Sequence, residues 1–201
     1  MSAAVVHAGV LAPGEPIYRM SVAQYHAALS AGVFTDGDPI ELLEGLLVEK
    51  RSKNPPHVIA LGNVMDAIAG LVPEGWSLRM QDPITLADGE PEPDLVVVRG
   101  ARRDYLARHP GPADVALVVE VSDTTLDRDR GIKLRSYARA GLAVYWVVNL
   151  VDRCVEVYSS PDADASTPTY RTRVTRALGD TIEVVVGGAP CGAVRVDALL
   201  I

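Results

Sequence analysis

Apolar residues recur every three or four positions in three segments of the chain, which is the spacing of one face of an α-helix. The helices that this spacing predicts cover residues 22–31, about 55–70 and 127–140. Local residues support the first helix, because Ser21 and Gln24 match a capping box at its start and Gly32 follows its end. A further helix, on the surface, is expected over residues 102–108.

Shorter apolar runs predict strands between these helices, and the runs without polar alternation are typical of strands buried on both faces. The strands expected are residues 39–50, 76–80, 83–86, 95–98, 115–121, 144–148 and 155–158. Gly45 indicates a hairpin turn or a bulge within the first of them. Residues 170–175 and 181–186 are expected to form a peripheral antiparallel pair, and residues 194–201 a final short strand or helical turn.

The order of these elements predicts an α/β protein with a mixed sheet and helices packed on it. A strand, a helix and a strand follow one another over residues 115–148, which implies a right-handed crossover and a parallel pair. Residues 1–16 are expected to be a flexible tail, because Pro13, Gly14 and Pro16 block regular structure. Residues 17–201 are then expected to form a single domain.

The composition of the chain excludes several classes of protein. Its 201 residues are 48% hydrophobic, which is enough for a sizeable core, and its 26 acidic against 19 basic residues give a net charge of -7. That charge argues against nonspecific coating of nucleic acid, but it does not exclude a nuclease, whose carboxylates need a metal before DNA approaches. Cys154 and Cys191 are too few for a zinc cluster or a disulfide framework. Without a signal peptide or a long apolar span, we expect a cytoplasmic protein with no membrane contact.

Two carboxylates stand at the ends of two predicted central strands. Asp94 precedes the apolar run of residues 95–98, and Glu120 ends the run of residues 115–121. If these strands pair, both carboxylates converge at one end of the sheet, where they suit Mg²⁺, which takes one or two carboxylates with phosphate oxygens and waters. Lys133, in the next helix, could polarise an attacking water or neutralise charge at a phosphate.

Each of these residues also has a purely structural interpretation. Asp94 is a plausible turn residue after Pro93, and Glu120 could mark the point where a strand reaches water. Lys133 has a helical partner four residues earlier in Asp129, with which it could form an exposed pair. The spacing alone leaves both interpretations open.

The segments Pro93-Asp94 and Glu120-Val121-Ser122 resemble the signature of the PD-(D/E)XK nuclease superfamily with its lysine displaced. Over about residues 20–160 the chain resembles the Uma2 family (DUF820) of restriction endonucleases. The residues that carry this second resemblance are Glu41-Leu42-Leu43-Glu44-Gly45, His57, Glu120 to Thr125, Asp129, Lys133, Tyr137, Gly141 and Tyr145-Trp146. The resemblance implies a restriction-endonuclease-like core over about residues 38–160, with flanking helices and a peripheral antiparallel C-terminal portion.

The same resemblance implies roles for individual residues. Asp94 and Glu120 would be metal ligands, Glu41 would complete the metal shell, and Lys133 would be the catalytic lysine, because Ser122 stands where the superfamily signature has its lysine. Further candidates for the site are Glu44, His57, Gln81, Ser122 and Tyr137. Glu44-Gly45-Leu46 departs from the Asp-Gly-Glu that family members more often show, which puts Glu44 in doubt.

The resulting hypothesis is an endonuclease that uses Mg²⁺ (or Mn²⁺) to hydrolyse DNA. A homodimer is expected, because cutting two DNA strands needs two sites. A local positive surface for DNA is expected from Arg102, Arg103, Arg108, Arg128, Arg130 and Arg135. One alternative is a non-catalytic nucleic-acid-binding or regulatory protein that retains the fold. Another is a metal-dependent hydrolase of a different phosphate compound.

Overall fold

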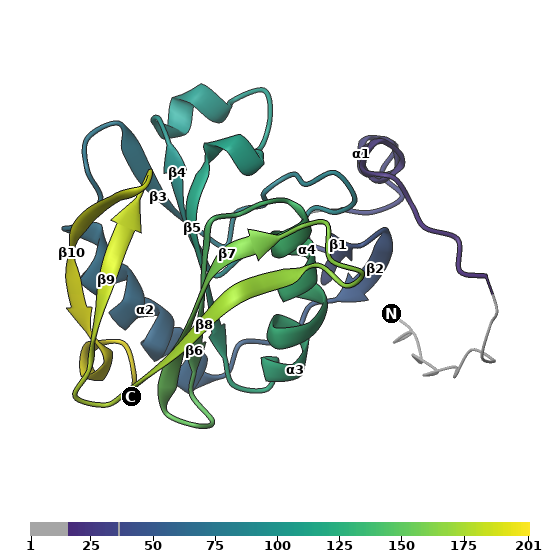
Figure 1. The fold of residues 1–201 in the computed structure, drawn as a ribbon. Coiled ribbons are helices and arrows are strands. Elements are labelled where there is room, and N and C mark those ends of the chain that lie inside the picture. Colours follow the sequence, from purple (N-terminus) through teal and green to yellow (C-terminus); the bar gives the residue numbers. More distant parts are fainter. Residues whose placement is uncertain (1–15, 36) are drawn as a thin grey trace.

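A six-stranded mixed sheet lies at the centre of the computed structural model, which describes residues 16–35 and 37–201 (Figure 1). In spatial order its strands are β3 (Trp76–Met80), β4 (Leu95–Arg99), β5 (Val115–Ser122), β6 (Val144–Asn149), β7 (Cys154–Asp162) and β8 (Thr169–Ala177). β5 and β6 run parallel, and the other neighbouring pairs in this sheet are antiparallel. The predicted α/β class with a mixed sheet and the predicted parallel pair are therefore confirmed.

Further elements cover both faces of the sheet, as Figure 1 shows. One face carries α2 (Pro55–Ala69) and the hairpin of β9 (Thr181–Val186) and β10 (Ala189–Arg195). The other face carries α3 (Leu126–Arg128), a π turn η3 (Asp129–Lys133) and α4 (Leu134–Arg139), which follow one another without a break. The remaining elements are α1 (Val22–Ser30), β1 (Ile40–Leu43), β2 (Leu46–Glu49) and the short 3₁₀ turns η1 (Arg102–Tyr105), η2 (Pro112–Asp114) and η4 (Val196–Ala198).

Alternation along β4 and β5 divides their side chains between two apolar clusters. In β5, Val119 and Val121 pack with α2, whereas Val118 packs with α4. All are buried, and burying a side chain of this size contributes about 1.5–3 kcal/mol to folding. Because Glu120 shares the alternation of Val118, its carboxylate points to the α4 side of the sheet.

Local signals at the ends of the helices are confirmed. α1 begins with the predicted capping box, in which the Ser21 side chain accepts from the Gln24 amide and the Gln24 side chain accepts from the Ser21 amide. α2 begins after Asn54, whose side chain accepts a hydrogen bond from the His57 amide at 3.1 Å. The third predicted helix is one continuous stretch from α3 through α4, ended near Gly141, whose φ is +73°. The His57 side chain is therefore presented from a rigid helix start.

The first predicted strand, residues 39–50, is a hairpin, which is one of the two options that Gly45 indicated. β1 and β2 pair with Leu43 opposite Leu46, which leaves Glu44 and Gly45 as a two-residue turn with φ angles of 48° and 75°. Such a turn needs positive φ at both positions. A Cβ at Gly45 would also lie 2.6 Å from the Cβ of Arg19, so glycine is required there twice over.

Two predicted elements are wrong in extent or type. Residues 83–86 do not form a strand, because their amides bond to separate carbonyls of Pro91, Gly89 and Pro110 rather than to one neighbouring strand. Nearby prolines lack the amide donors that a ladder needs. The helix expected over 102–108 is limited to the 3₁₀ turn η1, and Leu106 beyond it is 90% exposed, so no apolar face holds a longer helix in place.

The predicted pairing of residues 170–175 with 181–186 is also wrong. β8 pairs with β7, and β9 pairs with β10. The reason is that their apolar residues belong to different clusters: Tyr170 packs on the α4 face, whereas Ile182 packs on the α2 face. The segment of residues 194–201 combines both predicted options, since it holds the end of β10 and the turn η4.

The predicted tail of residues 1–16 lies outside the described residues, apart from Pro16. The assignment of residues 17–201 to a single domain stays a prediction. Among the helices of the described part, none is long and apolar enough to cross a membrane.

Candidate active site

Strand pairing brings Asp94 and Glu120 together. β4 and β5 are antiparallel with Leu95 opposite Val119, so Asp94, one residue before β4, falls opposite Glu120. The Oδ2 atom of Asp94 accepts a hydrogen bond of 2.9 Å from the Val121 amide, which fixes the carboxylate against β5. Both carboxylates line one hollow of about 110 Å³. The predicted convergence at one end of the sheet is confirmed by this geometry.

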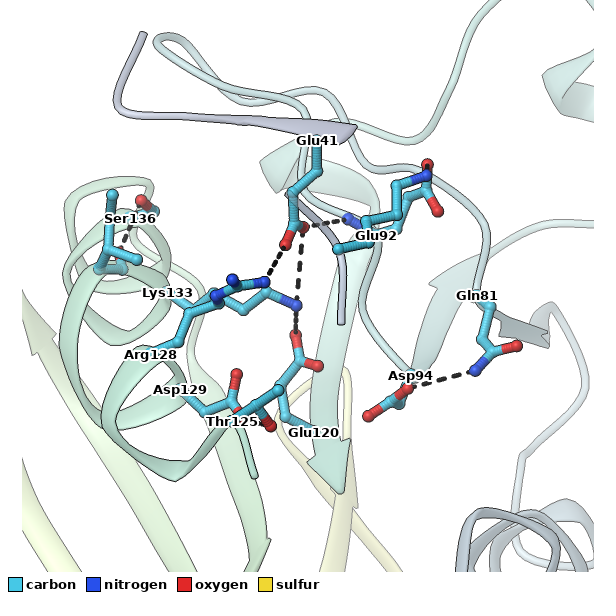
Figure 2. A network of polar contacts seen from close by, with 12 residues as sticks. Glu41, Gln81, Glu92, Asp94, Glu120, Thr125, Arg128, Asp129, Lys133 and Ser136 are labelled. Atoms are coloured by element: carbon cyan, nitrogen blue, oxygen red, sulfur yellow. Dashed lines mark hydrogen bonds and ion pairs between the residues drawn. The ribbon is translucent and has the colours of Figure 1, made fainter. Parts of the chain in front are cut away.

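Lys133 reaches the same hollow from the π turn on the opposite layer. Its Nζ atom lies 2.9 Å from Oε1 of Glu120 and 3.7 Å from Oε2 of Glu41. All three side chains are buried, with 7% of Lys133 and 3% of each glutamate exposed. Figure 2 shows the ammonium group between the two carboxylates, with the Arg128 guanidinium beside it and 3.5 Å from Oε1 of Glu41. Lys133 is therefore the buried counter-charge of two carboxylates and not half of an exposed pair.

Asp129 makes different contacts from those that helical spacing suggested. Its Oδ2 atom accepts hydrogen bonds from the hydroxyls of Ser122 at 2.7 Å and Thr125 at 2.6 Å. The π turn is wider than an α-helical turn, so residues four apart no longer stack as a direct pair. Ser122 is thus a buried donor that orients Asp129, and Asp129 itself lines the hollow.

His57 and Gln81 both contact the Asp94 carboxylate. The Nε2 atom of His57 lies 3.0 Å from Oδ2 of Asp94, and the Gln81 side-chain amide donates to Oδ1 at 3.3 Å. Gln81 adopts a left-handed backbone with φ of 57°, while its amide bonds to the carbonyls of Pro93 and Asp94. Such strain in a residue that is not glycine costs about 1–3 kcal/mol and is common at functional sites. Both residues line the hollow, and their part in a functional site stays a prediction.

Two other candidates have different surroundings. Glu44 lies in the β1–β2 turn, where its carboxylate pairs with Arg135 at 3.2 Å and Arg139 at 3.1 Å, and it does not line the hollow. Tyr137 is fully buried in the core and donates its hydroxyl to Oε1 of Glu120 at 2.7 Å. Tyr137 therefore positions Glu120 from within the core. Its side chain has no exposed surface with which to contact a phosphate.

Burial and charge set the protonation of the central pair. Burial raises the pKa of Glu120 well above its ordinary value; Lys133 opposes this, and the charges of Asp129 and Asp94 add to it. For Lys133 burial favours the neutral amine, but Glu120, Glu41, Asp129 and Asp94 together outweigh burial and raise its pKa. Lys133 therefore stays charged at neutral pH and cannot act as a base there.

Asp94 differs from Glu120 and Asp129 in having a pKa below its ordinary value. Burial alone raises its pKa, but the hydrogen bond and charge of His57, the charge of Lys133 and the Val121 amide outweigh burial. The net effect is a pKa below the ordinary value. By contrast, burial raises the pKa of Asp129 despite the charge of Lys133 and two hydroxyl donors. The site thus combines a firmly ionised carboxylate with others that hold protons more tightly.

Residues that the sequence analysis did not select also line the hollow. They are Lys50, Arg51, Lys53, Glu92, Thr125, Arg128 and Asp129. Of these, Arg128 was expected only as part of a surface patch, and Asp129 only as a partner of Lys133. The run Lys50-Arg51-Ser52-Lys53 lies just before the start of α2 and concentrates positive charge in a chain of net charge -7. This run is the sequence signal that could have pointed to Lys50, Arg51 and Lys53 as lining residues.

The arginine surface expected for DNA does not form as one patch. Arg130 pairs with Glu156, Arg135 with Glu44, and Arg108 with Asp114. These carboxylates neutralise much of the charge that the sequence suggested. Among the six arginines expected, Arg128 is the one that lines the hollow.

The donor chemistry of the hollow fits a hard divalent cation. In residues 16–35 and 37–201, no group of three or more His, Cys, Asp or Glu side chains is arranged to hold a metal, and the Glu41 carboxylate contacts Lys133 and Arg128. Asp94 and Glu120 nevertheless offer two carboxylates, and magnesium commonly uses one or two with waters and substrate oxygens. Four carboxylates lie close enough to Lys133 to raise its pKa, while burial favours the protonated forms of Glu120 and Asp129. A divalent cation bound to these carboxylates would favour their ionised forms.

Comparison with known proteins identifies the family and supports the fold of this chain. The Uma2 family, described as "Putative restriction endonuclease", matches residues 22–188. A crystal structure of a "putative nuclease belonging to DUF820" from Anabaena variabilis ATCC 29413 is similar in fold, with a TM-score of 0.61. It is 14% identical in sequence, and the alignment covers 90% of this chain and 97% of that one. A search of curated proteins found no significant match. Because the family match spans most of the sequence, the chain belongs to the Uma2 family.

Proposed function

We propose that this protein is a Mg²⁺-dependent endonuclease that hydrolyses phosphodiester bonds of DNA. The observation that carries the proposal is the buried Lys133 ammonium between Glu120 and Glu41, next to the ionised Asp94, in a hollow rimmed by cations. Burying this many charges is costly and does not in itself stabilise a fold. The family description supports the same reaction class.

Asp94 and Glu120 are the residues that would hold the metal, with Glu41 nearby as a further carboxylate. When bound, Mg²⁺ would offset charge on the scissile phosphate and lower the pKa of an attacking water. Tyr137 and the Val121 amide keep the two carboxylates in place through hydrogen bonds of 2.7 Å and 2.9 Å. This orientation is established before any substrate arrives.

Lys133 would stabilise the negative charge that develops on the phosphate during hydrolysis. It remains protonated because four carboxylates raise its pKa. A fixed ammonium in a buried site stabilises developing charge more strongly than one in water. This role is the one that the resemblance of the sequence implied for Lys133.

Cleavage of both DNA strands requires two copies of the site, so we propose a homodimer as the active form. The cytoplasmic location also remains a proposal, based on the sequence pattern and not on a feature of the fold.

The test is cleavage of plasmid and linear DNA with Mg²⁺ or Mn²⁺ by the wild type and Asp94→Asn. We expect the wild type to cut and Asp94→Asn to lose at least a hundredfold in rate, because the amide cannot supply the same charge to a metal. Asp66→Asn, an exposed aspartate on α2, is the matched control and should cut like the wild type.

Equal cleavage by Asp94→Asn and the wild type would contradict the proposed site. DNA binding by the wild type without cleavage, at any tested metal, would instead support a non-catalytic protein that keeps the fold. Competition between DNA and small phosphate esters separates a nuclease from a hydrolase of another phosphate compound.

A further inference from the structure

We infer that the loop between β2 and α2, residues 50–54, is a phosphate-backbone binding element, with Arg51 and Lys53 as its two contacts. This inference rests on the proposed function in taking a nucleic acid as substrate. It adds to that function a site that holds the nucleic-acid backbone next to the scissile phosphate.

The loop lies where several hollows meet. Arg51 lines the hollow that holds Asp94 and Glu120, a second hollow with Arg128, and a third with His57 and Asp123. Lys53 lines the first and the third of these. A single segment therefore borders three neighbouring hollows, one of which holds the buried carboxylates.

Arg51 and Lys53 are distinguished from the other cations of the hollow by having no carboxylate partner. Lys50 pairs with Glu92 at 2.6 Å, and Arg128 and Lys133 pair with the buried glutamates already described. The Lys53 ammonium instead donates to the neutral Gln81 amide, and within the described part of the chain the Arg51 guanidinium has neither a hydrogen bond nor an ion pair.

Uncompensated charge at this position has a physical consequence. Both side chains are exposed, so they keep their charge in water at little cost. In a chain of net charge -7 they form a local positive rim directly beside an acidic centre, which can attract a polyanion to that centre. Arginine binds phosphate with its planar fork and lysine as a point charge, so the pair suits two neighbouring phosphates.

Hydrogen bonds connect the loop to the proposed metal ligands. Lys53 donates to the Gln81 side chain, which donates to Asp94 at 3.3 Å. A phosphate bound by Lys53 would thus be one side chain away from Asp94. Gln81, with its strained backbone, is the residue that separates the two.

The test is fluorescence anisotropy with a short labelled DNA duplex in a chelating buffer, so that no cleavage occurs, over a series of salt concentrations. The variants are Arg51→Ala with Lys53→Ala, the charge-conserving Arg51→Lys with Lys53→Arg, and Arg102→Ala with Arg103→Ala. The last pair is the matched control, because both arginines are exposed on η1, have no ion pair or side-chain hydrogen bond in the described part of the chain, and lie outside these hollows.

We expect the double alanine variant to bind severalfold more weakly and its slope of log K against log salt to be smaller by about 2, since each lost phosphate contact removes about 0.9. The charge-conserving variant should keep the wild-type slope, and so should the η1 control. A wild-type slope in the double alanine variant, an equal loss in the η1 control, or no binding by the wild type would each overturn the inference. Cleavage with Mg²⁺ is assayed separately: its absence in the wild type would reject the nuclease proposal without affecting the binding result.

Discussion

Replacing Lys133 by methionine tests the electrostatic balance of the site. Methionine keeps much of the apolar stem but removes the ammonium that lies 2.9 Å from Glu120 and 3.7 Å from Glu41. Removing one partner of a buried ion pair costs about 3–5 kcal/mol, because the other charge remains buried. Glu41 keeps its contact with Arg128, so Glu120 carries most of the loss.

Protonation of Glu120 limits this cost and makes it depend on pH. Taking up a proton at pH 7 against an ordinary pKa of 4.5 costs about 3.4 kcal/mol, and at pH 5 about 0.7 kcal/mol. Since the variant raises the folded pKa of Glu120 further above the unfolded value, the native state binds more protons than the unfolded state, and stability falls as pH rises. We expect a penalty of about 3 kcal/mol at pH 7 and below about 1 kcal/mol at pH 5.

The assay is urea unfolding of the wild type and Lys133→Met at both pH values, with the free energies of unfolding subtracted at each. Adding Glu120→Gln to the methionine variant should remove most of the penalty and its pH dependence, because no buried carboxylate is then left at that position. An equal penalty at pH 5 and pH 7, or a penalty under about 1 kcal/mol at pH 7, would refute this reasoning.

Two further substitutions probe buried carboxylates by urea unfolding. Burial raises the pKa of Glu156, but hydrogen bonds from Arg130 and Tyr158 bring it below the ordinary value, so its contribution is present above the unfolded pKa and is lost as pH falls through the folded one. Glu156→Gln should therefore cost about 2–3 kcal/mol at neutral pH and flatten the loss of stability in acid, and a curve parallel to the wild type would contradict this. Tyr137→Phe removes the 2.7 Å hydrogen bond to Glu120 and should cost about 1–3 kcal/mol, whereas an unchanged midpoint would show that the bond contributes nothing.

Features determined by neighbouring residues were predictable from the sequence. The capping box of Ser21 and Gln24, the start of α2 after Asn54 and the turn at Gly45 all depend on side chains within a few positions. The convergence of Asp94 and Glu120 was predictable for a related reason. A carboxylate before one strand and another within its neighbour can meet when the two strands pair, and the register that places Leu95 opposite Val119 brings them together.

Features determined by tertiary packing were not predictable in the same way. β8 and β9 have similar strand-like sequences, and only the cluster that each one's apolar residues join decides their partners. The π turn that carries Asp129 and Lys133 has the same sequence periodicity as an α-helix, yet it changes which groups these side chains contact. The ion pair that helical spacing allowed between them is replaced by contacts to β1, β5 and the start of α3.

The basic loop shows the same limit within the site. Lys50-Arg51-Ser52-Lys53 is visible in the sequence as a charged run, which is ordinarily a solvated surface. Its position beside Asp94 depends on the packing of α2 against the sheet and on the strained backbone of Gln81. Neither is encoded in a pattern that a short window of sequence contains.

The most direct test of the metal-dependent site is calorimetric titration of Mn²⁺ or Mg²⁺ into the wild type and Glu120→Ala, with and without a short DNA duplex. Circular dichroism serves as the control that the Glu120→Ala variant is folded. We expect the wild type to bind metal, the affinity to increase when DNA is present, and the variant to lose binding under both conditions. No binding by the wild type with or without DNA, or equal binding by Glu120→Ala, would contradict a metal site at Asp94 and Glu120.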